Sequence, residues 1–525
     1  MSAPLLHGTS LQGVTGQGTW FGHPKGVFLV AFTELWERFS YFGMTGLLAL
    51  YLTADTASGG WGWSSGDAVL FYGIYTGLVF VVPVLGAWIA NSYLGERRCI
   101  VIGAILMMTG HLLLSGPTLL VSVIEHFTHI DAEAVITQSG VALGRIWALP
   151  DVGRALAKTA AQSSDTAADA LRLYRAAIWT YVAGGGSFLL GLACIVAATG
   201  LFKSTITSIV GKMYPESDAR RDAGYAVLLT CVYVGAVLAN LTAGGLGEKF
   251  GWPYGFGAAA VGMAIALVVY LWKEKQYLGD IGVVPDRTTA SMANESSGAN
   301  IREERSRLWV LILQGIFTTI YAAAFYQKGG LLTLYTRDYV DRALFGFQVP
   351  ATWFMSISVL VFMIATPLLA VAYLRLARQN RNPSASYKLA AGLIAIGAAY
   401  ALVAAAEATR EATDGIAVSG LWLIGMYVLF GISDALVWPN QLALATKLSP
   451  KRFAALTVGA WHFVIGIGTF LAALIATIAG YFGILEVFHV LAALCLAAGA
   501  LVALMTPMMR RWMHGAENTT LSSRR

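Results

Sequence analysis

Three charged residues stand at helical spacing inside a long apolar stretch near the start of the chain. Glu34, Glu37 and Arg38 belong to the string FTELWERFSYFGMTGLLALYL, and the spacing i, i+3, i+4 puts them on one face of a helix. One charge at mid-bilayer costs about 3 kcal/mol on insertion scales. The cluster therefore indicates a functional site that faces a wet cavity. The alternative is a buried ion pair that only ties helices together, but such pairs stabilise proteins poorly.

A lone lysine, Lys203, lies in a second apolar stretch, TGLFKSTITSIVG. About ten residues, roughly 15 Å of helix rise, separate it from the loop at Met213 and Tyr214, so the alternative of snorkelling to the interface would strain the side chain. A lysine on one helix and two carboxylates with Arg38 on another could form a proton-switched network. An ionised carboxylate would pair with a cation, and a protonated one would release that cation for a substrate carboxylate.

The composition is that of a protein whose solvent is lipid. Of the 525 residues 57% are hydrophobic and 12% are charged, whereas soluble proteins carry about 25% charged residues. The net charge of +6 comes from basic residues at helix ends, which form no aromatic-interleaved patch, so no nucleic-acid partner is expected. The lipid bilayer is the expected surrounding partner.

Other classes of site lack their sequence motifs. The cysteines all fall in apolar segments without CxxC or metal-ligand spacing, so they are interpreted as small buried hydrophobes: Cys99, Cys194, Cys231 and Cys495. The chain contains no phosphate-binding GxxxxGK[ST] loop, no HExxH and no serine elbow. We therefore expect no metal, no cofactor, no ATP-driven step and no enzymatic activity.

Twelve apolar segments are long enough to span a bilayer. Their approximate ranges are 26–53, 68–91, 98–124, 182–212, 223–247, 253–273, 308–336, 350–376, 388–407, 419–446, 453–479 and 484–508. An even number places both termini on one side of the membrane. Basic residues collect in one set of loops, whereas the opposite loops 54–67 and 480–483 have none, which predicts cytoplasmic termini.

The order of the segments predicts an all-α membrane protein built from two six-helix bundles. Residues 1–273 form the first bundle and residues 308–525 the second. The cytoplasmic connector 274–307 contains TTASMANESSGAN, which predicts disorder. Residues 125–181 form an external insert that is too often interrupted by charge to span, and we expect one or two amphipathic helices with a break at Pro150. We interpret the insert as a surface decoration in preference to a functional lid.

Several sequence blocks together resemble one family. Glu34, Glu37 and Arg38 followed by FSYFG resemble the ExxERFxYYG motif of proton-dependent oligopeptide transporters (the POT or PTR family), a branch of the major facilitator superfamily. The resemblance continues through both halves in GAWIANSYLGERR, TGLFKSTITSIVGKMYP, FYQKGG, DALVWP and TKLSPKRFAALTVGAW. It leaves out mainly the external insert and the connector.

The resemblance implies the major facilitator fold and a proton-coupled symporter that works by alternating access in the bacterial cytoplasmic (inner) membrane. It implies protons and a peptide-like or carboxylate-bearing substrate as partners. It assigns proton coupling to Glu34, Glu37, Arg38 and Lys203, and substrate binding to Arg38, Tyr41, Lys203, Tyr233, Ser358, Asp434 and Trp461. A Lys328–Asp434 bridge between the helical halves is the expected outer gate.

The chain departs from the family pattern at the substrate pocket. Thr45 takes the place of a second arginine in span one, and Tyr326 takes the place of its acidic partner in span seven. Tyr233 and Ser358 replace two asparagines that help to hold a peptide's ammonium group in the family. Ordinary di- and tripeptides are therefore doubtful substrates. The 34-residue connector also has no room for the two additional helices of many bacterial members, which favours twelve helices over fourteen.

Three functions remain open from the sequence. The first is proton-driven import of peptides or peptide-like molecules. The second is proton-coupled transport of a non-peptide metabolite or drug. The third is a non-transporting membrane sensor or scaffold, with the insert binding a partner. A scaffold has no need of buried charges, so Glu34, Glu37, Arg38 and Lys203 favour transport.

Overall fold

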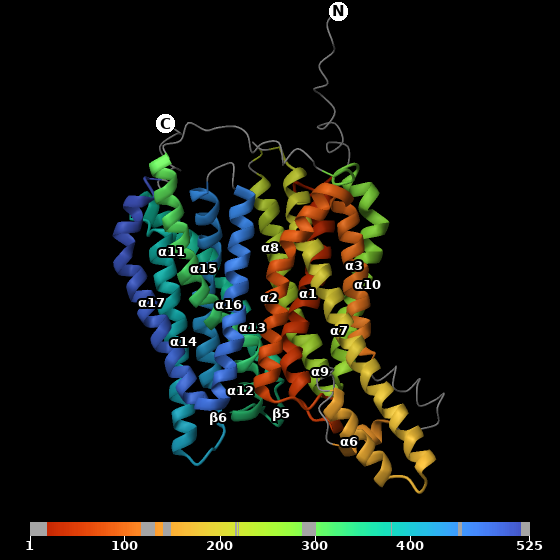
Figure 1. Ribbon diagram of the computed structural model, residues 1–525. Helices are drawn as coiled ribbons and strands as arrows, with labels where there is room; N and C mark the ends of the chain where they lie inside the picture. Colours follow the sequence, from red (N-terminus) through yellow and green to blue (C-terminus); the bar gives the residue numbers. More distant parts are fainter. Residues whose placement is uncertain are drawn as a thin grey trace, which may run out of the picture.

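The computed structural model describes residues 18–116, 132–139, 149–215, 218, 220–285, 301–379, 381–449 and 454–515. These residues are almost entirely helical, and the long helices run side by side (Figure 1). Both ends of the described chain lie at one end of the bundle, at the top of Figure 1, which we call the terminal end. The other end, which carries α6 and α12, is called the opposite end.

The first half of the chain supplies six long helices. They are α1 (Lys25–Thr53), α2 (Ser65–Ile89), α3 (Glu96–Ser115), α7 (Ala167–Lys212), α8 (Arg220–Ala239) with its short continuation α9 (Gly245–Phe250), and α10 (Trp252–Leu278). One π-helical turn, Asn240–Gly244, joins α8 to α9, and another, Ala90–Leu94, follows α2. The sixth long helix ends at Leu278, inside the range 274–307 that the sequence predicts for the connector.

The second half supplies six more. They are α11 (Ile301–Phe325) with α12 (Leu331–Tyr339) after a 3-10 turn at Tyr326–Gly329, α13 (Ala351–Arg378), α14 (Ala385–Ala412), α15 (Gly420–Leu448), α16 (Ala454–Phe482) and α17 (Ile484–Trp512). Three pairs of two-residue strands lie in the connections: β1 (Thr19–Trp20) with β2 (His23–Pro24), β3 (Val340–Asp341) with β6 (Val418–Ser419), and β4 (Ala343–Leu344) with β5 (Phe347–Gln348). Only the β3–β6 pair is parallel among the described strands.

The predicted twelve spanning helices are present. Within the described residues, eleven helical segments are long and apolar enough to cross a membrane. The twelfth is α1, which has 29 residues and carries Glu34, Glu37 and Arg38. Its charges lower its mean hydropathy, yet 22 of its residues are buried. A span that is charged and still buried belongs in the interior of the bundle, away from lipid.

The insert is helical, as the sequence predicts, but its second part is not separate from the fourth span. Helices α5 (Ala132–Ser139) and α6 (Leu149–Gln162) pack on α7, which runs unbroken for 46 residues. Thr166 caps α7 by accepting a hydrogen bond from the Asp169 N–H at 3.1 Å. Pro150 is the second residue of α6 among the described residues, a position where proline is tolerated. The predicted break at Pro150 stays a prediction, because residues 140–148 lie outside the described ranges.

Several expectations concern residues outside the described ranges. These include the TTASMANESSGAN stretch of the connector, part of the insert (117–131 and 140–148), and the basic residues Arg287, Lys451 and Arg452. The boundaries between bundle, connector and bundle stay predictions.

The two halves meet along a pair of helices at the side of the bundle. Helix α2 packs against α16, and a Cβ at Gly73 would collide with the Cβ of Ala473. Further along the same two helices, Gly77 lies against the Thr469 hydroxyl. Small residues at such crossings let helix backbones approach closely, which is a main source of helix association in lipid. The halves are therefore in direct contact beside the charged cluster.

Candidate functional site

The predicted charged cluster forms on α1. The Arg38 Nε lies 3.1 Å from Glu34 Oε1, and it also forms an ion pair with Glu37 Oε2. Glu37 is 0% exposed, Arg38 7% and Glu34 8%. One guanidinium is thus shared by two buried carboxylates. Because Glu34 Oε2 and Glu37 Oε1 have no hydrogen-bond partner among the described residues, acceptor capacity remains in the cluster.

Close packing of α1 against α8 holds Arg38 in place. A Cβ at Gly235 of α8 would collide with the Leu35 carbonyl oxygen and would press on the Arg38 Cβ. The guanidinium carbon also lies 5.3 Å from the centre of the Tyr41 ring, which is a favourable position for a cation. Gly235 on α8 and the Tyr41 ring, one turn after Arg38 on α1, therefore fix the position of the guanidinium. Tyr41, predicted for the substrate site, adjoins the cluster.

Lys203 lies near the cluster but is not ion-paired with it. Its Nζ lies 4.1 Å from the centre of the Phe80 ring of α2, and the side chain is half-buried. No ion pair in the described part of the chain joins Lys203 to Glu34 or Glu37, although the lysine is close enough to act on both carboxylates electrostatically. Lys203 is thus within the field of the carboxylates and held by an aromatic face.

Among the predicted pocket residues, Tyr233 makes a ring contact between the two halves. Its ring centre on α8 lies 4.3 Å from that of Phe362 on α13. Ser358 is buried, and its hydroxyl donates to the Met355 carbonyl of its own helix at 2.9 Å. Trp461 is buried in the core of the second half, and its Nε1–H has no hydrogen-bond partner among the described residues. Ser358 therefore takes part in helix packing in this structure.

The expected Lys328–Asp434 bridge is not formed in this structure. Among the ion pairs of the described residues none joins these two side chains, and the Lys328 Nζ lies 3.7 Å from the centre of the Phe325 ring. Both residues are buried, and Asp434 Oδ1 has no hydrogen-bond partner in the described chain. Lys328 follows α11 and Asp434 lies on α15, so both belong to the second half. A bridge between them would connect two helices of one half, which corrects the expectation that it joins the halves.

A chain of aromatic contacts connects the rings that cover the two lysines. The ring of Phe80 on α2 lies 5.3 Å from that of Tyr326, and Tyr326 lies 6.4 Å from Trp438 on α15. Trp438 also contacts Phe325, the ring beneath Lys328, at 5.9 Å. Tyr326 was noted from the sequence as a replacement for an acidic residue of the family pattern, and the structure shows that an aromatic contact takes the place of that charged pair. The other three rings were not singled out from the sequence, where Trp438 was visible only as a tryptophan within DALVWP.

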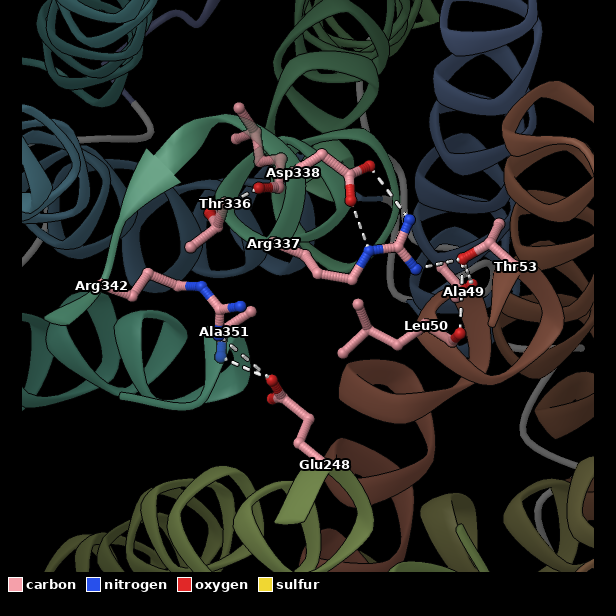
Figure 2. Close-up of polar contacts among 10 residues, drawn as sticks. Ala49, Leu50, Thr53, Glu248, Thr336, Arg337, Asp338, Arg342 and Ala351 are labelled. Atoms are coloured by element: carbon pink, nitrogen blue, oxygen red, sulfur yellow. Dashed lines mark hydrogen bonds and ion pairs between the residues drawn. The ribbon is translucent and has the colours of Figure 1, made fainter. Parts of the chain in front are cut away.

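A carboxylate joins the two halves at the opposite end of the bundle (Figure 2). Glu248 of α9 accepts hydrogen bonds from the first backbone N–H groups of α13, at 2.8 Å from Ala351 and 3.0 Å from Thr352. The Thr352 hydroxyl also donates to it at 2.8 Å, and Arg342 Nη1 lies 3.5 Å away. Burial lowers the pKa of the Arg342 guanidinium below its usual range, an effect that Glu248 opposes. Glu248 therefore caps a helix of the other half.

A second polar contact crosses the halves beside it. Arg337 of α12 donates from Nη1 to the Thr53 hydroxyl at the end of α1, at 2.7 Å (Figure 2). The same guanidinium pairs with its neighbour Asp338. Nearby, the Trp353 Nε1–H donates to the Leu241 carbonyl at 2.9 Å. The opposite end of the bundle is thus closed by contacts between the halves.

Comparison with known proteins identifies the family. A sequence profile of the POT family matches residues 97–279 and 272–491, which is more than half of the chain. The chain belongs to the POT family. It is a multi-pass integral membrane transporter and not an enzyme, and the resemblance inferred from the ExxER motif is confirmed.

The relatives are bacterial and similar over nearly their whole length. The peptide transporter YePEPT of Yersinia enterocolitica is 27% identical over 88% of this chain and 89% of its own. The uncharacterized transporter YclF of Bacillus subtilis is 26% identical over 95% of this chain and 97% of its own.

The solved structures establish the fold. A mutant of a peptide transporter POT in complex with sulfate has a TM-score of 0.77 at 24% identity and covers 96% of this chain and 99% of its own. A POT family transporter in complex with 5-aminolevulinic acid has a TM-score of 0.75 at 22% identity, over 95% of this chain and 100% of its own. The predicted major facilitator fold is thereby confirmed.

The shared guanidinium makes a prediction for stability. Arg38→Met leaves two buried carboxylates without a cation, and we expect it to destabilise the protein by about 3–5 kcal/mol. The triple variant Glu34→Gln/Glu37→Gln/Arg38→Met removes the charges together and should recover most of that loss. Thermal unfolding in detergent measures both.

The matched control is Arg220→Met, which breaks an exposed pair with Asp218 at the membrane surface and should cost at most about 1 kcal/mol. Equal unfolding temperatures for Arg38→Met and Arg220→Met would refute the charge-sharing interpretation.

Proposed function

We propose that the protein is a proton-coupled symporter that imports peptide-like or carboxylate-bearing small molecules by alternating access. The observation that carries the proposal is the single Arg38 guanidinium shared between two buried carboxylates. Two carboxyl groups and one fixed cation in a buried site tend toward a state in which one of the carboxyl groups holds a proton. When one of these acids takes up a proton, another anion can therefore take the place of its carboxylate beside Arg38.

The proposed coupling step follows from charge balance. When a proton binds Glu37 or Glu34, the attraction between that carboxyl group and Arg38 falls. Arg38, with Lys203 nearby, is then free to pair with a substrate carboxylate, which a guanidinium binds well with two parallel hydrogen bonds. Loss of the proton reverses the exchange and expels the substrate anion. Proton and substrate thus enter the site together.

We infer that the terminal end faces the cytoplasm. Basic residues collect at that end, for example Arg97 and Arg98 in the first turn of α3, and Arg375 and Arg378 at the end of α13. The opposite end, held by Glu248 and Arg337, is then the external side. On this assignment the structure is closed to the outside, and transport requires the Glu248 cap on α13 to break and reform in each cycle.

The substrate class follows from groups that are no longer available for an ammonium ion. The Tyr233 ring packs on Phe362, and the Ser358 hydroxyl donates within its own helix. Asp434 is a buried carboxylate of the second half that has no ion-pair partner among the described residues, whereas the buried Glu407 pairs with Arg410. We assign Asp434 to the amino-terminal side of the substrate, with Lys328 as the cation that competes for it. A non-peptide carboxylate without a free α-amino group is the second candidate. The contacts of Tyr233 and Ser358 are the observations that favour it.

The first prediction tests proton coupling. Glu37→Gln keeps the shape of the side chain and removes its charge, so we expect uptake driven by a pH gradient to fall by at least about 100-fold. Counterflow exchange of labelled substrate should continue, because it needs no net proton movement. Both are measured in proteoliposomes with the same preparation. Full gradient-driven accumulation by Glu37→Gln would exclude Glu37 as the proton carrier.

The second prediction tests the external closure. Glu248→Ala removes three hydrogen bonds to α13 and the Arg342 partner, and a loss of about 1.5–3 kcal/mol should shift the closed–open equilibrium about tenfold or more. The reporter is a cysteine introduced at Thr45, which lies on α1 between Arg38 and the closure at Thr53. The four native cysteines are replaced by serine. The reporter should react correspondingly faster with a membrane-impermeant thiol reagent added outside.

Glu411→Ala is the matched control for this experiment. Glu411 is an exposed carboxylate in the last turn of α14, and no ion pair among the described residues joins it to the first half. Its labelling rate should stay within about twofold of the parent. A parent-like rate in Glu248→Ala would show that the carboxylate does not hold the halves together.

The third prediction concerns substrate. We expect dialanine to compete poorly for transport and N-acetyl-dialanine to compete as well or better, because the ammonium contacts are reduced while Arg38 still needs an anion. The C-terminal amide of dialanine should compete worst. Competition against a transported tracer in proteoliposomes measures all three. Strong competition by dialanine that disappears on N-acetylation would mean that Asp434 alone suffices for ammonium recognition.

A further inference from the structure

A small basic pocket lies between α14, α15 and α17 at the terminal end, outside the site described above. Its volume is about 140 Å³, many times the roughly 10–15 Å³ that one water needs by the same measure. It is lined by Asn382, Pro383, Ser384, Ala385, Lys388, Asn440, Ala443, Leu444, Lys447 and Arg510. The pocket therefore has room for a small polar group.

The charges around this pocket have one sign. Lys388, Lys447 and Arg510 come from three different helices, and none of the described residues that line the pocket is acidic. Cations gathered in one concave space repel each other and raise the local affinity for an anion. The basic pocket is thus suited to an external anion.

The neighbouring groups hold the cations in position. The Lys388 Nζ donates to the Asn440 Oδ1 at 3.0 Å and lies 3.8 Å from the centre of the Tyr373 ring. The pocket also contains the start of α14, where Ser384 caps the helix by accepting from the Tyr387 N–H at 3.4 Å. The partial positive charge at the start of a 28-residue helix adds to that of the side chains.

We propose that this pocket binds the phosphate group of an anionic phospholipid of the cytoplasmic leaflet. The pocket lies where three spanning helices begin or end, which is the depth of lipid headgroups. Leu442 and Tyr387, beside the lining residues Ala443 and Lys388, are 43% and 39% exposed, so apolar surface for acyl chains adjoins the basic group. Basic pockets between helices on the cytoplasmic side are typical headgroup sites. The assignment of the leaflet rests on the proposed orientation of the transporter.

The test compares lipid binding by two triple variants with equal loss of charge. The site variant is Lys388→Gln/Lys447→Gln/Arg510→Gln, and the control is Arg375→Gln/Arg378→Gln/Arg511→Gln, which changes basic residues of the same half outside the pocket. Delipidated protein in neutral detergent is titrated with phosphatidylglycerol, with phosphatidylcholine and with inorganic phosphate. Native mass spectrometry counts bound lipid, and thermal unfolding measures stabilisation.

We expect the wild type and the control variant to bind phosphatidylglycerol alike and the site variant to bind it about tenfold more weakly. Phosphatidylcholine should bind weakly to all three, and inorganic phosphate should stabilise none of them at matched concentration. Equal phosphatidylglycerol binding by site and control variants would overturn the proposal.

If inorganic phosphate stabilised the protein as strongly as phosphatidylglycerol does, the proposal of a lipid ligand would be overturned. The pocket would then be assigned to a soluble anion. Should the triple site variant fail to fold, Lys447→Gln, an exposed position in the last turn of α15, serves in its place. We expect about a threefold weakening for this single change, and unchanged binding counts against the proposal. Because the readout is lipid binding, it is independent of whether Glu37 carries protons.

Discussion

The organisation of this transporter depends on the cost of keeping two carboxylates and one guanidinium inside a membrane. Lipid excludes such a group, so α1 is buried within the bundle although its length and composition are those of a span. Glycine at position 235 brings α8 close enough to fix the Arg38 side chain, and Tyr41 covers its guanidinium. The site thus holds one fixed cation for two carboxylates, and the proposed coupling rests on this imbalance of charge.

The polar contacts that join the two halves lie apart from the charged cluster on α1. The charged pair that the family pattern predicts near span one is absent, since Thr45 and Tyr326 stand in its place, and an aromatic contact between Phe80 and Tyr326 occupies the region. At the opposite end of the bundle, Glu248 of the first half binds the start of α13 in the second half. This carboxylate of the first half thus caps a helix of the second half and joins the two halves there. In the proposed mechanism, proton exchange and gating are carried by separate groups.

Much of the fold followed from the sequence because hydropathy and helical spacing are local signals. The twelve spans, the α1 cluster and the helical nature of the insert were predicted in this way. Glu248 was not, because an acidic residue in the string GLGEKFG looks like an ordinary helix end until α13 is brought beside it. The orientation of Ser358 toward its own helix and of Lys203 and Lys328 toward aromatic rings likewise depends on neighbours far away in sequence. Contacts between helices, which the sequence pattern does not encode locally, decided these cases.

The central claim is that proton and substrate share the Arg38 site, and proton uptake on substrate binding tests it most directly. Isothermal titration of one bound substrate in two buffers that differ in ionisation enthalpy gives the number of protons taken up per substrate bound. The account predicts a net uptake of protons by the wild type in a pH range where the cluster is partly ionised, and none by Glu37→Gln. Substrate binding by the wild type with no proton uptake at any pH between about 5 and 8 would contradict it.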